Sequence, residues 1–209
     1  MLVNEIFYSL QGEGRWIGLR NVFVRTSGCN LRCRFCDTTY AYEGGKQMSV
    51  DELLEAILKY SCKRACLTGG EPLLQKDSFE LVKILREQDF FVLIETNGSC
   101  DISDFCEDAG VVVSLDIKCP SSGMAEKMDF ENIGLLSDKD QLKLVIGNRD
   151  DYEYAKDIIC RFSPSAPVFL QPVWGFDFKE LAKWILQDDL EVRLGIQLHK
   201  LVWGQQRGV

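Results

Sequence analysis

The chain has 209 residues, 46% apolar and 27% charged, and its 24 Lys and Arg against 32 Asp and Glu leave a net charge of −8. This composition is typical of a packed globular protein, expected to be one domain over residues 1–209, and it excludes a disordered chain. The acidic balance excludes a broad nucleic-acid footprint, because phosphate binding needs clustered cations. No apolar run approaches the roughly 18 residues that cross a bilayer. We therefore expect a cytoplasmic protein with no membrane contact.

Strands and helices alternate from the first residues onward. The apolar pattern predicts strands at 2–8 and 21–25, followed by a loop from about 27 to 47. Ser49 and Glu52 have the spacing of a capping box, which predicts a helix at 49–60. A short strand then ends at Thr68. After the turn Gly69-Gly70-Glu71-Pro72 comes a second amphipathic helix, whose apolar face is Phe79, Leu81, Val82, Ile84 and Leu85.

The second half of the chain repeats this pattern. We expect strands at 90–95, 111–116, 141–146, 168–170 and 192–196, and helices at 103–109, 151–160 and 177–187. Such alternation implies right-handed crossovers and a parallel sheet. A closed eight-stranded barrel typically needs about 250 residues. With about six core parallel strands, the chain should form an open, partial α/β barrel, and the polar segment 121–127 is the only stretch expected to be a flexible insertion.

Four motifs rich in polar residues and glycine follow predicted strands. They are Thr68 to Pro72, Glu95 to Gly98, Ser114 to Lys118, and Gln171 with Pro172. Ligands of parallel α/β sheets bind beyond the carboxyl ends of the strands. We therefore expect these motifs to converge on one mouth.

Three of the nine cysteines lie close together in the first long loop. Cys29, Cys33 and Cys36 have C-x3-C-x2-C spacing. Three thiolates on a [4Fe–4S] cluster leave one iron open for another ligand, whereas a structural zinc site needs four ligands. The alternative is a zinc site or a four-cysteine cluster completed by another cysteine. We interpret the other six as small packing residues, namely Cys62, Cys66, Cys100, Cys106, Cys119 and Cys160.

The cysteine triplet and the glycine turn at the next strand end together resemble the radical S-adenosylmethionine (SAM) superfamily. The resemblance implies a [4Fe–4S] cluster, SAM chelated to its open iron, and a 5′-deoxyadenosyl radical that abstracts hydrogen from substrate. No protein side chain is then required as a catalytic group. Two adjacent glycines also leave backbone groups accessible to a ligand. The SAM contacts implied are Phe35, Cys36, Asp37, Gly69, Gly70, Glu71, Glu95, Ser114, Leu115, Asp116, Gln171, Pro172, Val173 and Trp174.

Within that superfamily the chain resembles the 7-carboxy-7-deazaguanine synthase family over essentially its whole length. The residues that carry this resemblance are Ser9 to Gly14, Arg25, Asp37 with Thr38, and His199. The family's reaction contracts the ring of 6-carboxy-5,6,7,8-tetrahydropterin with loss of ammonia, as a carbon–nitrogen lyase of queuosine biosynthesis. The resemblance implies a substrate carboxylate paired with Arg25 and Mg²⁺ bound at Thr38. The other implied substrate contacts are Leu10, Gln11, Gly12, Glu13, Thr68, His199 and the terminal Val209.

Other interpretations stay open for single residues and for the whole chain. Taken alone, the Thr38 hydroxyl is more typical of a cap on a backbone N–H, and a lone His199 is more often structural. A glycyl-radical-enzyme activase has the same cysteine triplet, but it gives no reason for the Ser9 to Gly14 motif or for Thr38. A non-enzymatic iron–sulfur sensor needs a fourth cysteine ligand. The resemblance also implies a homodimer and a flavodoxin- or ferredoxin-type reductant.

Overall fold

One continuous sheet of nine strands organises the computed structural model, which describes residues 1–209. The sheet order is β3-β1-β2-β4-β5-β6-β7-β8-β9, and the edge strands β3 and β9 do not pair with each other, so the sheet is open. Parallel pairing runs from β2 through β4 to β9, whereas β1 is antiparallel to both of its neighbours. The strands are β1 (Leu2–Leu10), β2 (Arg20–Thr26), β3 (Lys46–Gln47), β4 (Arg64–Gly69), β5 (Phe91–Thr96), β6 (Val111–Ile117), β7 (Gln141–Ile146), β8 (Val168–Pro172) and β9 (Arg193–Leu194). The predicted partial barrel is confirmed. Its six longer parallel strands are β2 and β4 to β8, and the two-residue strand β9 pairs with β8 at the edge.

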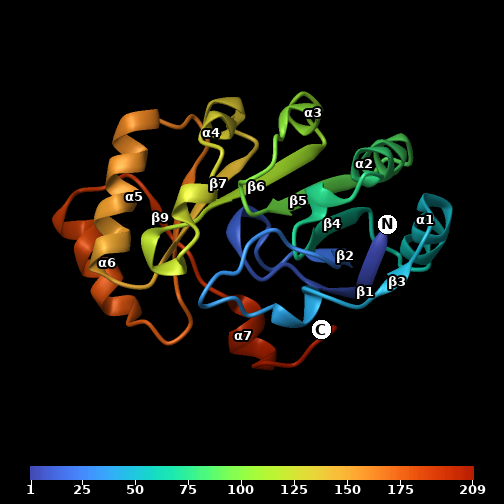
Figure 1. Cartoon of the computed structure of the whole chain (residues 1–209), viewed down its shortest axis with the longest axis horizontal. Helices are drawn as coiled ribbons and strands as arrows, with labels where there is room; N and C mark the ends of the chain where they lie inside the picture. Colours follow the sequence, from blue (N-terminus) through green and yellow to red (C-terminus); the bar gives the residue numbers. More distant parts are fainter.

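Six of the seven helices follow one another around the outside of the sheet, whereas the last lies apart from them near the C-terminus (Figure 1). The helices are α1 (Val50–Leu58), α2 (Ser78–Glu87), α3 (Ser103–Cys106), α4 (Glu131–Leu135), α5 (Arg149–Phe162), α6 (Phe178–Gln187) and α7 (Leu198–Trp203). None of them is long and apolar enough to span a membrane.

Local signals in the sequence account for several helix starts. Ser49 accepts the backbone N–H of Glu52 at 3.2 Å, and the Glu52 carboxylate accepts the Ser49 N–H at 2.8 Å, so the predicted capping box begins α1. Asn148 caps α5 and Asp177 caps α6 in the same manner, each through a side-chain oxygen. These caps fix where three of the outer helices begin.

The two faces of the sheet carry different layers. Between the sheet and the outer helices lies the main core of 36 buried residues. On the inner face a smaller apolar cluster, Phe23, Cys66, Leu93 and Val112, occupies four neighbouring strands in matching register. Because side chains alternate along a strand, the residues two positions further along point to the same inner face. Arg25, Thr68, Glu95 and Ser114 therefore line the barrel interior directly above an apolar floor.

Two local predictions were wrong, and two short helices were missed. Segment 121–127 is not a flexible insertion, because its polypeptide forms two short 3-10 turns around the fully buried Ser122, whose hydroxyl bonds Cys119 and Met124. The helix expected at 103–109 ends at Cys106. The short helices α4 and α7 were not predicted, since neither is long enough to show a helical apolar period.

Candidate active site

The four polar motifs lie at strand carboxyl ends, as predicted. β4 ends at Gly69, β5 at Thr96, β6 at Ile117 and β8 at Pro172, and these strands run parallel. The cysteine loop follows β2, whose carboxyl end lies at the same edge. The mouth of the barrel is therefore built from five strand ends.

The cysteine loop is held by segments that follow three of these strands. After β4, the Glu71 N–H donates to Gly28 O at 2.8 Å. After β5, the Asn97 amide donates to Asn30 at 3.0 Å and to the Cys29 Sγ at 3.7 Å. After β6, Ser122 O accepts the Arg34 N–H at 3.1 Å. These contacts tie the cysteine loop to the barrel.

The glycine turn packs directly against the cysteine loop. A Cβ at Gly70 would lie 2.0 Å from Gly28 O and 3.0 Å from the Cys29 Cβ. A Cβ at Gly69, whose φ is +141°, would lie 2.3 Å from Thr26 O. Both positions therefore require glycine, because the two backbones approach each other too closely for any side chain.

Glu71 supports this turn through its side chain. The carboxylate is fully buried and accepts hydrogen bonds from the Leu73 N–H at 2.9 Å, the Thr96 hydroxyl at 2.9 Å and the Asn97 N–H at 2.6 Å. Burial raises the pKa of Glu71, and these three donors oppose that effect. The side chain is therefore fully occupied within the protein, which leaves only the Glu71 backbone for a contact with SAM.

We expect Glu71→Gln to lower the free energy of unfolding by about 2 kcal/mol, because the new amide group directs hydrogens at one of the three donors. Urea denaturation measures this change. Glu80→Gln, an exposed position on α2, is the matched control and should change stability by less than about 0.5 kcal/mol. Equal stability of the two variants would show that the carboxylate does not hold the turn.

The donor set of the cysteine loop fits an iron–sulfur cluster with a separate iron for each thiolate. Cys29, Cys33 and Cys36 are all free and half-buried. Three thiolates are one ligand short of a closed structural zinc site, whereas on a cube they hold three irons and leave the fourth open.

The predicted packing role of the remaining six cysteines is wrong for the exposed Cys160 and fits the buried ones. Cys62, Cys66 and Cys119 are buried, and the Cys62 Sγ donates to Arg20 O at 3.2 Å. Cys66 belongs to the apolar floor of the barrel. The Cys106 Sγ donates to Ile102 O at 3.3 Å, Cys160 is exposed on α5, and Cys100 is half-buried beside Ser99.

Above the apolar floor, a cluster of buried charges fills the barrel interior. Lys143 on β7 is 9% exposed, and its Nζ lies 2.9 Å from Glu13, 3.3 Å from Asp116 and 3.6 Å from Glu95. Lys118 adds a second cation 2.9 Å from Asp116. Although burial acts to raise their pKa values, the pKa of Glu13 and the pKa of Asp116 are lowered by these lysines. Both carboxylates are therefore ionised hydrogen-bond acceptors.

The Gln11 to Glu13 segment connects this cluster to the C-terminal helix. The Gln11 amide donates to Glu95 at 3.2 Å, and Gln197 donates to Glu13 at 2.9 Å. The Gly12 O accepts the Leu198 N–H at 2.9 Å. A Cβ at Gly12 would lie 2.1 Å from the His199 Nδ1, so the imidazole packs directly on this glycine.

His199 is half-buried beside the same cluster. Burial lowers the pKa of His199, and the neighbouring Glu13 and Asp37 act in the opposite direction. The imidazole is therefore neutral near pH 7, with one nitrogen able to donate and the other able to accept.

Asp37 and Thr38 join the cysteine loop to α7. The Thr38 hydroxyl donates to Asp37 at 3.0 Å, and it caps no backbone N–H, contrary to the simpler interpretation of this residue. The other Asp37 oxygen pairs with Lys200 at 2.7 Å. Desolvation acts to raise the pKa of Asp37, but the Lys200 ammonium and the Thr38 hydroxyl lower it to about 2.

Arg25 points into the barrel interior with part of its guanidinium already paired. Its Nε lies 2.7 Å from Glu5, which also accepts the Tyr40 hydroxyl at 3.0 Å. The terminal nitrogens of Arg25 make no hydrogen bond or ion pair. This leaves the outer edge of the guanidinium for an anionic ligand, next to Thr68 in the β2–β4 register.

The other residues that the resemblance assigned to SAM differ in burial and in whether their polar side-chain atoms already have partners within the protein. The Leu115 side chain lies in the main core, and the Ser114 hydroxyl accepts the Gln141 amide at 2.7 Å. Gln171 is buried, and its Nε2 has no partner within the protein. Pro172 is buried, whereas Trp174 is 44% exposed. Phe35 and Val173 are half-buried, Phe35 in the cysteine loop and Val173 just after β8.

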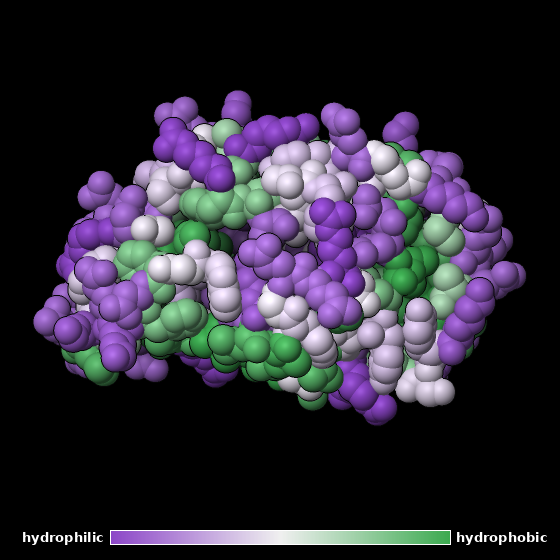
Figure 2. Space-filling view, turned by 90° about the horizontal axis from the view of Figure 1, so that it is seen from below, coloured by the Kyte–Doolittle hydropathy of each residue, from purple (hydrophilic) through white to green (hydrophobic).

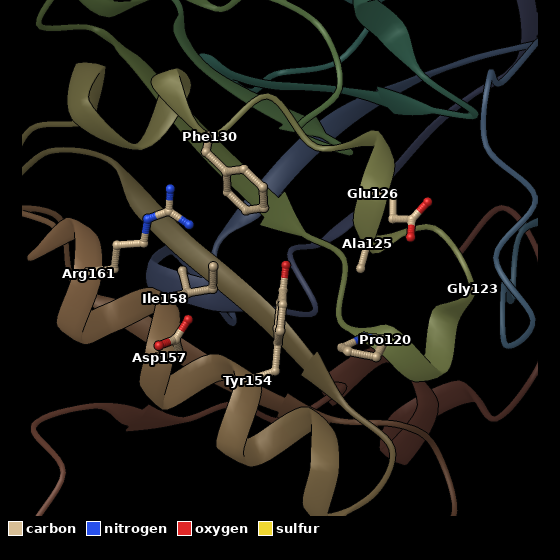
Figure 3. A pocket seen from close by; sticks show the side chains of 9 residues that line it. All are labelled: Pro120, Gly123, Ala125, Glu126, Phe130, Tyr154, Asp157, Ile158 and Arg161. Carbon is tan, nitrogen blue, oxygen red and sulfur yellow. The ribbon is translucent and has the colours of Figure 1, made fainter.

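Leu10 and Val209 lie together at a surface cavity of about 370 Å³, with Tyr8, Ser9, Arg20, Trp203 and Gly208 as its other walls. A larger cavity of about 650 Å³ lies outside the mouth and contains none of the predicted site residues. In Figure 3, Phe130 and Tyr154 face this larger space, with Arg161 and Asp157 from α5 on one side and Glu126 on the other.

Two polar residues of the mouth, Gln141 and Lys143, were absent from the prediction, whereas Asn97 and Lys118 lie in motifs expected there but had no individual role. A signal for the first two was available, because Gln141 and Lys143 alternate with leucines on an otherwise apolar strand. Such alternation indicates a strand with one polar face, which here is the barrel interior.

The sequence comparisons agree with this geometry. The family model of the radical SAM superfamily matches residues 23–159 of this chain. The 7-carboxy-7-deazaguanine synthase of Thermoplasma acidophilum is 38% identical over 209 residues, covering all of both chains. The synthase of Methanospirillum hungatei is 42% identical over 206 residues, covering 97% of this chain and 85% of its own.

Two solved structures share the fold. QueE from Escherichia coli superposes with a TM-score of 0.78 at 23% identity, covering 95% of this chain and 94% of that one. SuiB from Streptococcus suis, bound to S-adenosylmethionine, superposes with a TM-score of 0.60 at 15% identity, covering 81% of this chain and 48% of that one.

Proposed function

Because the chain belongs to the radical SAM superfamily and, within it, to the 7-carboxy-7-deazaguanine synthase family, we propose that it converts 6-carboxy-5,6,7,8-tetrahydropterin into 7-carboxy-7-deazaguanine and ammonia. The observation that carries this proposal is a single mouth with the cysteine loop on one side and the Gln11 to Glu13 segment with His199 on the other. The cluster with its SAM supplies a 5′-deoxyadenosyl radical when bound, and every other requirement falls on the protein.

Cys29, Cys33 and Cys36 would hold the cluster, and the adjacent strand ends would hold SAM. Backbone groups of Gly69 to Glu71 lie against the cysteine loop and can meet the amino-acid end of SAM. Phe35 to Asp37 belong to the loop itself, and Ser114 to Asp116 lie at the end of β6. Gln171, with an unpartnered amide nitrogen, can donate to an adenine or ribose acceptor. The shared fold with SuiB, which binds SAM, supports this placement.

The charged cluster inside the barrel suits the pterin ring. A tetrahydropterin presents several N–H donors along its aminopyrimidinone edge, and ionised carboxylates are acceptors only. Glu13 is therefore assigned to that edge, with Gln11, Gly12, Thr68 and the neutral His199 around the ring. The free edge of the Arg25 guanidinium is assigned to the substrate carboxylate. Leu10 and Val209 lie at a surface cavity, so their contact with substrate depends on movement of the C-terminal tail.

Thr38 is assigned to Mg²⁺. Its hydroxyl lies beside Asp37 at the boundary between the cysteine loop and α7. Mg²⁺ commonly keeps several waters and takes few protein ligands, so one hydroxyl suffices when substrate oxygens complete the shell. The ion would therefore bind with the substrate and orient it.

We expect Thr38→Ala to raise the Mg²⁺ concentration that gives half-maximal product formation by about tenfold or more, because one ligand of a weakly held ion is lost. Cleavage of SAM without product formation should persist. A Mg²⁺ titration of turnover measures the effect. Thr39→Ala, at the exposed neighbouring residue, is the control and should titrate as the parent does. An unchanged Mg²⁺ response in Thr38→Ala would exclude this role.

We also propose a single domain that works as a homodimer in the cytoplasm and is reduced by a flavodoxin or ferredoxin. Exposed apolar side chains support the dimer, since Leu201 is 62% and Val202 53% exposed on α7. Figure 2, viewed from the α7 side, shows apolar patches between polar ones on this face. Nine free cysteines and an exposed cluster loop are suited to a reducing compartment.

Anaerobic incubation of the reconstituted, reduced protein with SAM, Mg²⁺ and 6-carboxytetrahydropterin tests the proposed function. Mass spectrometry should detect 7-carboxy-7-deazaguanine, with ammonia released in equal amount. Absence of the deazapurine under conditions that cleave SAM would refute the substrate assignment and leave an activase open. Absence of any spectral response of the cluster to SAM would favour a sensor.

A further inference from the structure

One buried side chain in the barrel has contacts that no substrate or cofactor assignment explains. Lys143 is 9% exposed and comes from the centre of β7. It contacts carboxylates from three separate segments, at 2.9 Å (Glu13), 3.3 Å (Asp116) and 3.6 Å (Glu95). A buried lysine without partners would lose its charge, so these three carboxylates are what keep it protonated.

Lys143 is the one cation that contacts all three of these segments, although β5 and β6 also pair with each other. Glu13 lies in the loop after β1, Glu95 at the end of β5 and Asp116 near the end of β6. Glu95 also accepts the Gln11 amide, and Glu13 accepts the Gln197 amide. Lys118 contacts only Asp116 within this cluster. Lys143 is therefore the single cation through which the N-terminal motif and the two strands are held in one arrangement.

The charges of the cluster do not cancel. When all three are ionised, Glu13, Glu95 and Asp116 carry three negative charges against the two positive charges of Lys118 and Lys143, and burial already raises the pKa of Glu95. Without Lys143 the three carboxylates would repel one another in a low-dielectric interior and would take up protons. A protonated carboxyl group is a donor on one oxygen, which is the wrong polarity for an N–H edge.

We propose that Lys143 is a positioning residue for the aminopyrimidinone edge of the ligand: it holds Glu13 and its neighbours ionised and in place before the pterin binds. This inference rests on the proposed function and adds a specificity determinant to it. The site selects a ligand edge of N–H donors because Lys143 fixes the acceptor polarity of the carboxylates. Lys143 itself contacts neither substrate nor SAM, since its ammonium is taken up by the three carboxylates.

The probe for this role is the stable product 7-carboxy-7-deazaguanine, which carries the same aminopyrimidinone edge. Calorimetry with the cluster-loaded protein should show its affinity reduced about tenfold or more at pH 6.5 in both Lys143→Met and Lys143→Gln. The affinity for SAM should fall less than the affinity for product, because Asp116 and Glu95, which are also assigned to SAM, keep Lys118 and Gln11 as partners. In turnover, the loss should fall on KM more than on kcat.

The pH dependence separates positioning from a purely structural role. Removing the cation raises the carboxylate pKa values, so the affinity of both variants for product should recover as the pH rises from 6.5 to 8.5. The parent should show no such recovery. All three proteins keep the titratable groups that face Lys143 or its partners, so the comparison isolates the effect of the missing ammonium. These groups are Glu13, Glu95, Asp116, Lys118, Cys66 and His199.

Lys139→Met is the matched control. Lys139 pairs at 3.0 Å with the fully buried Asp140, away from the mouth, so its loss should lower stability without changing product affinity. The positioning role would be overturned if a folded Lys143 variant bound product as tightly as the parent does. It would also be overturned if the reduced affinity did not change with pH, or if both variants failed to fold. Failure of the proposed function is a separate result, since the parent would then bind no product at all.

Discussion

Replacing Cys33 by alanine should leave the protein folded but unable to hold its cluster. Cys33 is half-buried, and its only hydrogen bond within the protein is made by its carbonyl, which accepts the Cys36 N–H at 3.3 Å and which alanine retains. The thiolate, by contrast, is proposed as one of three cluster ligands, and two ligands would not retain a cubane cluster. We expect iron to fall from about four per chain to near zero, and all cleavage of SAM to cease.

Iron analysis and the visible spectrum after anaerobic reconstitution measure this effect. The matched control is Cys106→Ala, because Cys106 is equally half-buried but its Sγ only donates to Ile102 O within α3. This variant should bind the parent amount of iron and lose at most about 1 kcal/mol of stability. Retention of the cluster in Cys33→Ala, or its loss in Cys106→Ala, would contradict the ligand assignment.

Gly70→Ala should damage the mouth without removing any ligand. The new methyl group would lie 2.0 Å from Gly28 O, which is backbone and cannot rotate away. Relief would separate the glycine turn from the cysteine loop and stretch the bonds from Gly70 N to Thr26 O at 3.1 Å and from Glu71 N to Gly28 O at 2.8 Å. We expect the free energy of unfolding to fall by about 2–4 kcal/mol, with lower cluster incorporation, because overpacking and strained hydrogen bonds add together.

Gly134→Ala provides the control for this change. Gly134 lies on the exposed side of α4, and a Cβ there meets nothing within 4 Å. Alanine should therefore be neutral or stabilise the helix by up to about 1 kcal/mol. Denaturant unfolding with iron analysis compares the two. If Gly70→Ala matched Gly134→Ala in both measurements, close backbone contact would not be what positions the loop.

The architecture was predictable where periodicity or a local motif decided it. The capping box at Ser49 and Glu52 determines where α1 begins. The alternation of strands and helices predicts the parallel order, and chain length predicts that the barrel stays open. Segment 121–127 was wrongly predicted to be flexible because its polar composition resembles that of a mobile loop. In the fold, Ser122 is buried and its carbonyl accepts a hydrogen bond from the cysteine loop.

The sequence predicted which strand ends form the site, but it did not predict the contacts between the side chains that lie there. Resemblance identified Gly12 and His199 separately, and only the fold shows that the imidazole requires a glycine beneath it. Lys143 was missed because only its alternation with the neighbouring leucines marked it, and this lysine matches no motif of the family. Its partners Glu13, Glu95 and Asp116 are up to 130 residues away in sequence, and only the barrel brings them together.

Turnover with substrate deuterated at C6 tests the central claim most directly, namely that this mouth places the pterin C6 beside the SAM held over the cysteine loop. Mass spectrometry of recovered SAM and 5′-deoxyadenosine should show deuterium in the adenosyl group, with deuterium-depleted 7-carboxy-7-deazaguanine as product. Product formed while the adenosyl group of both molecules stays free of deuterium would contradict hydrogen abstraction from the bound pterin.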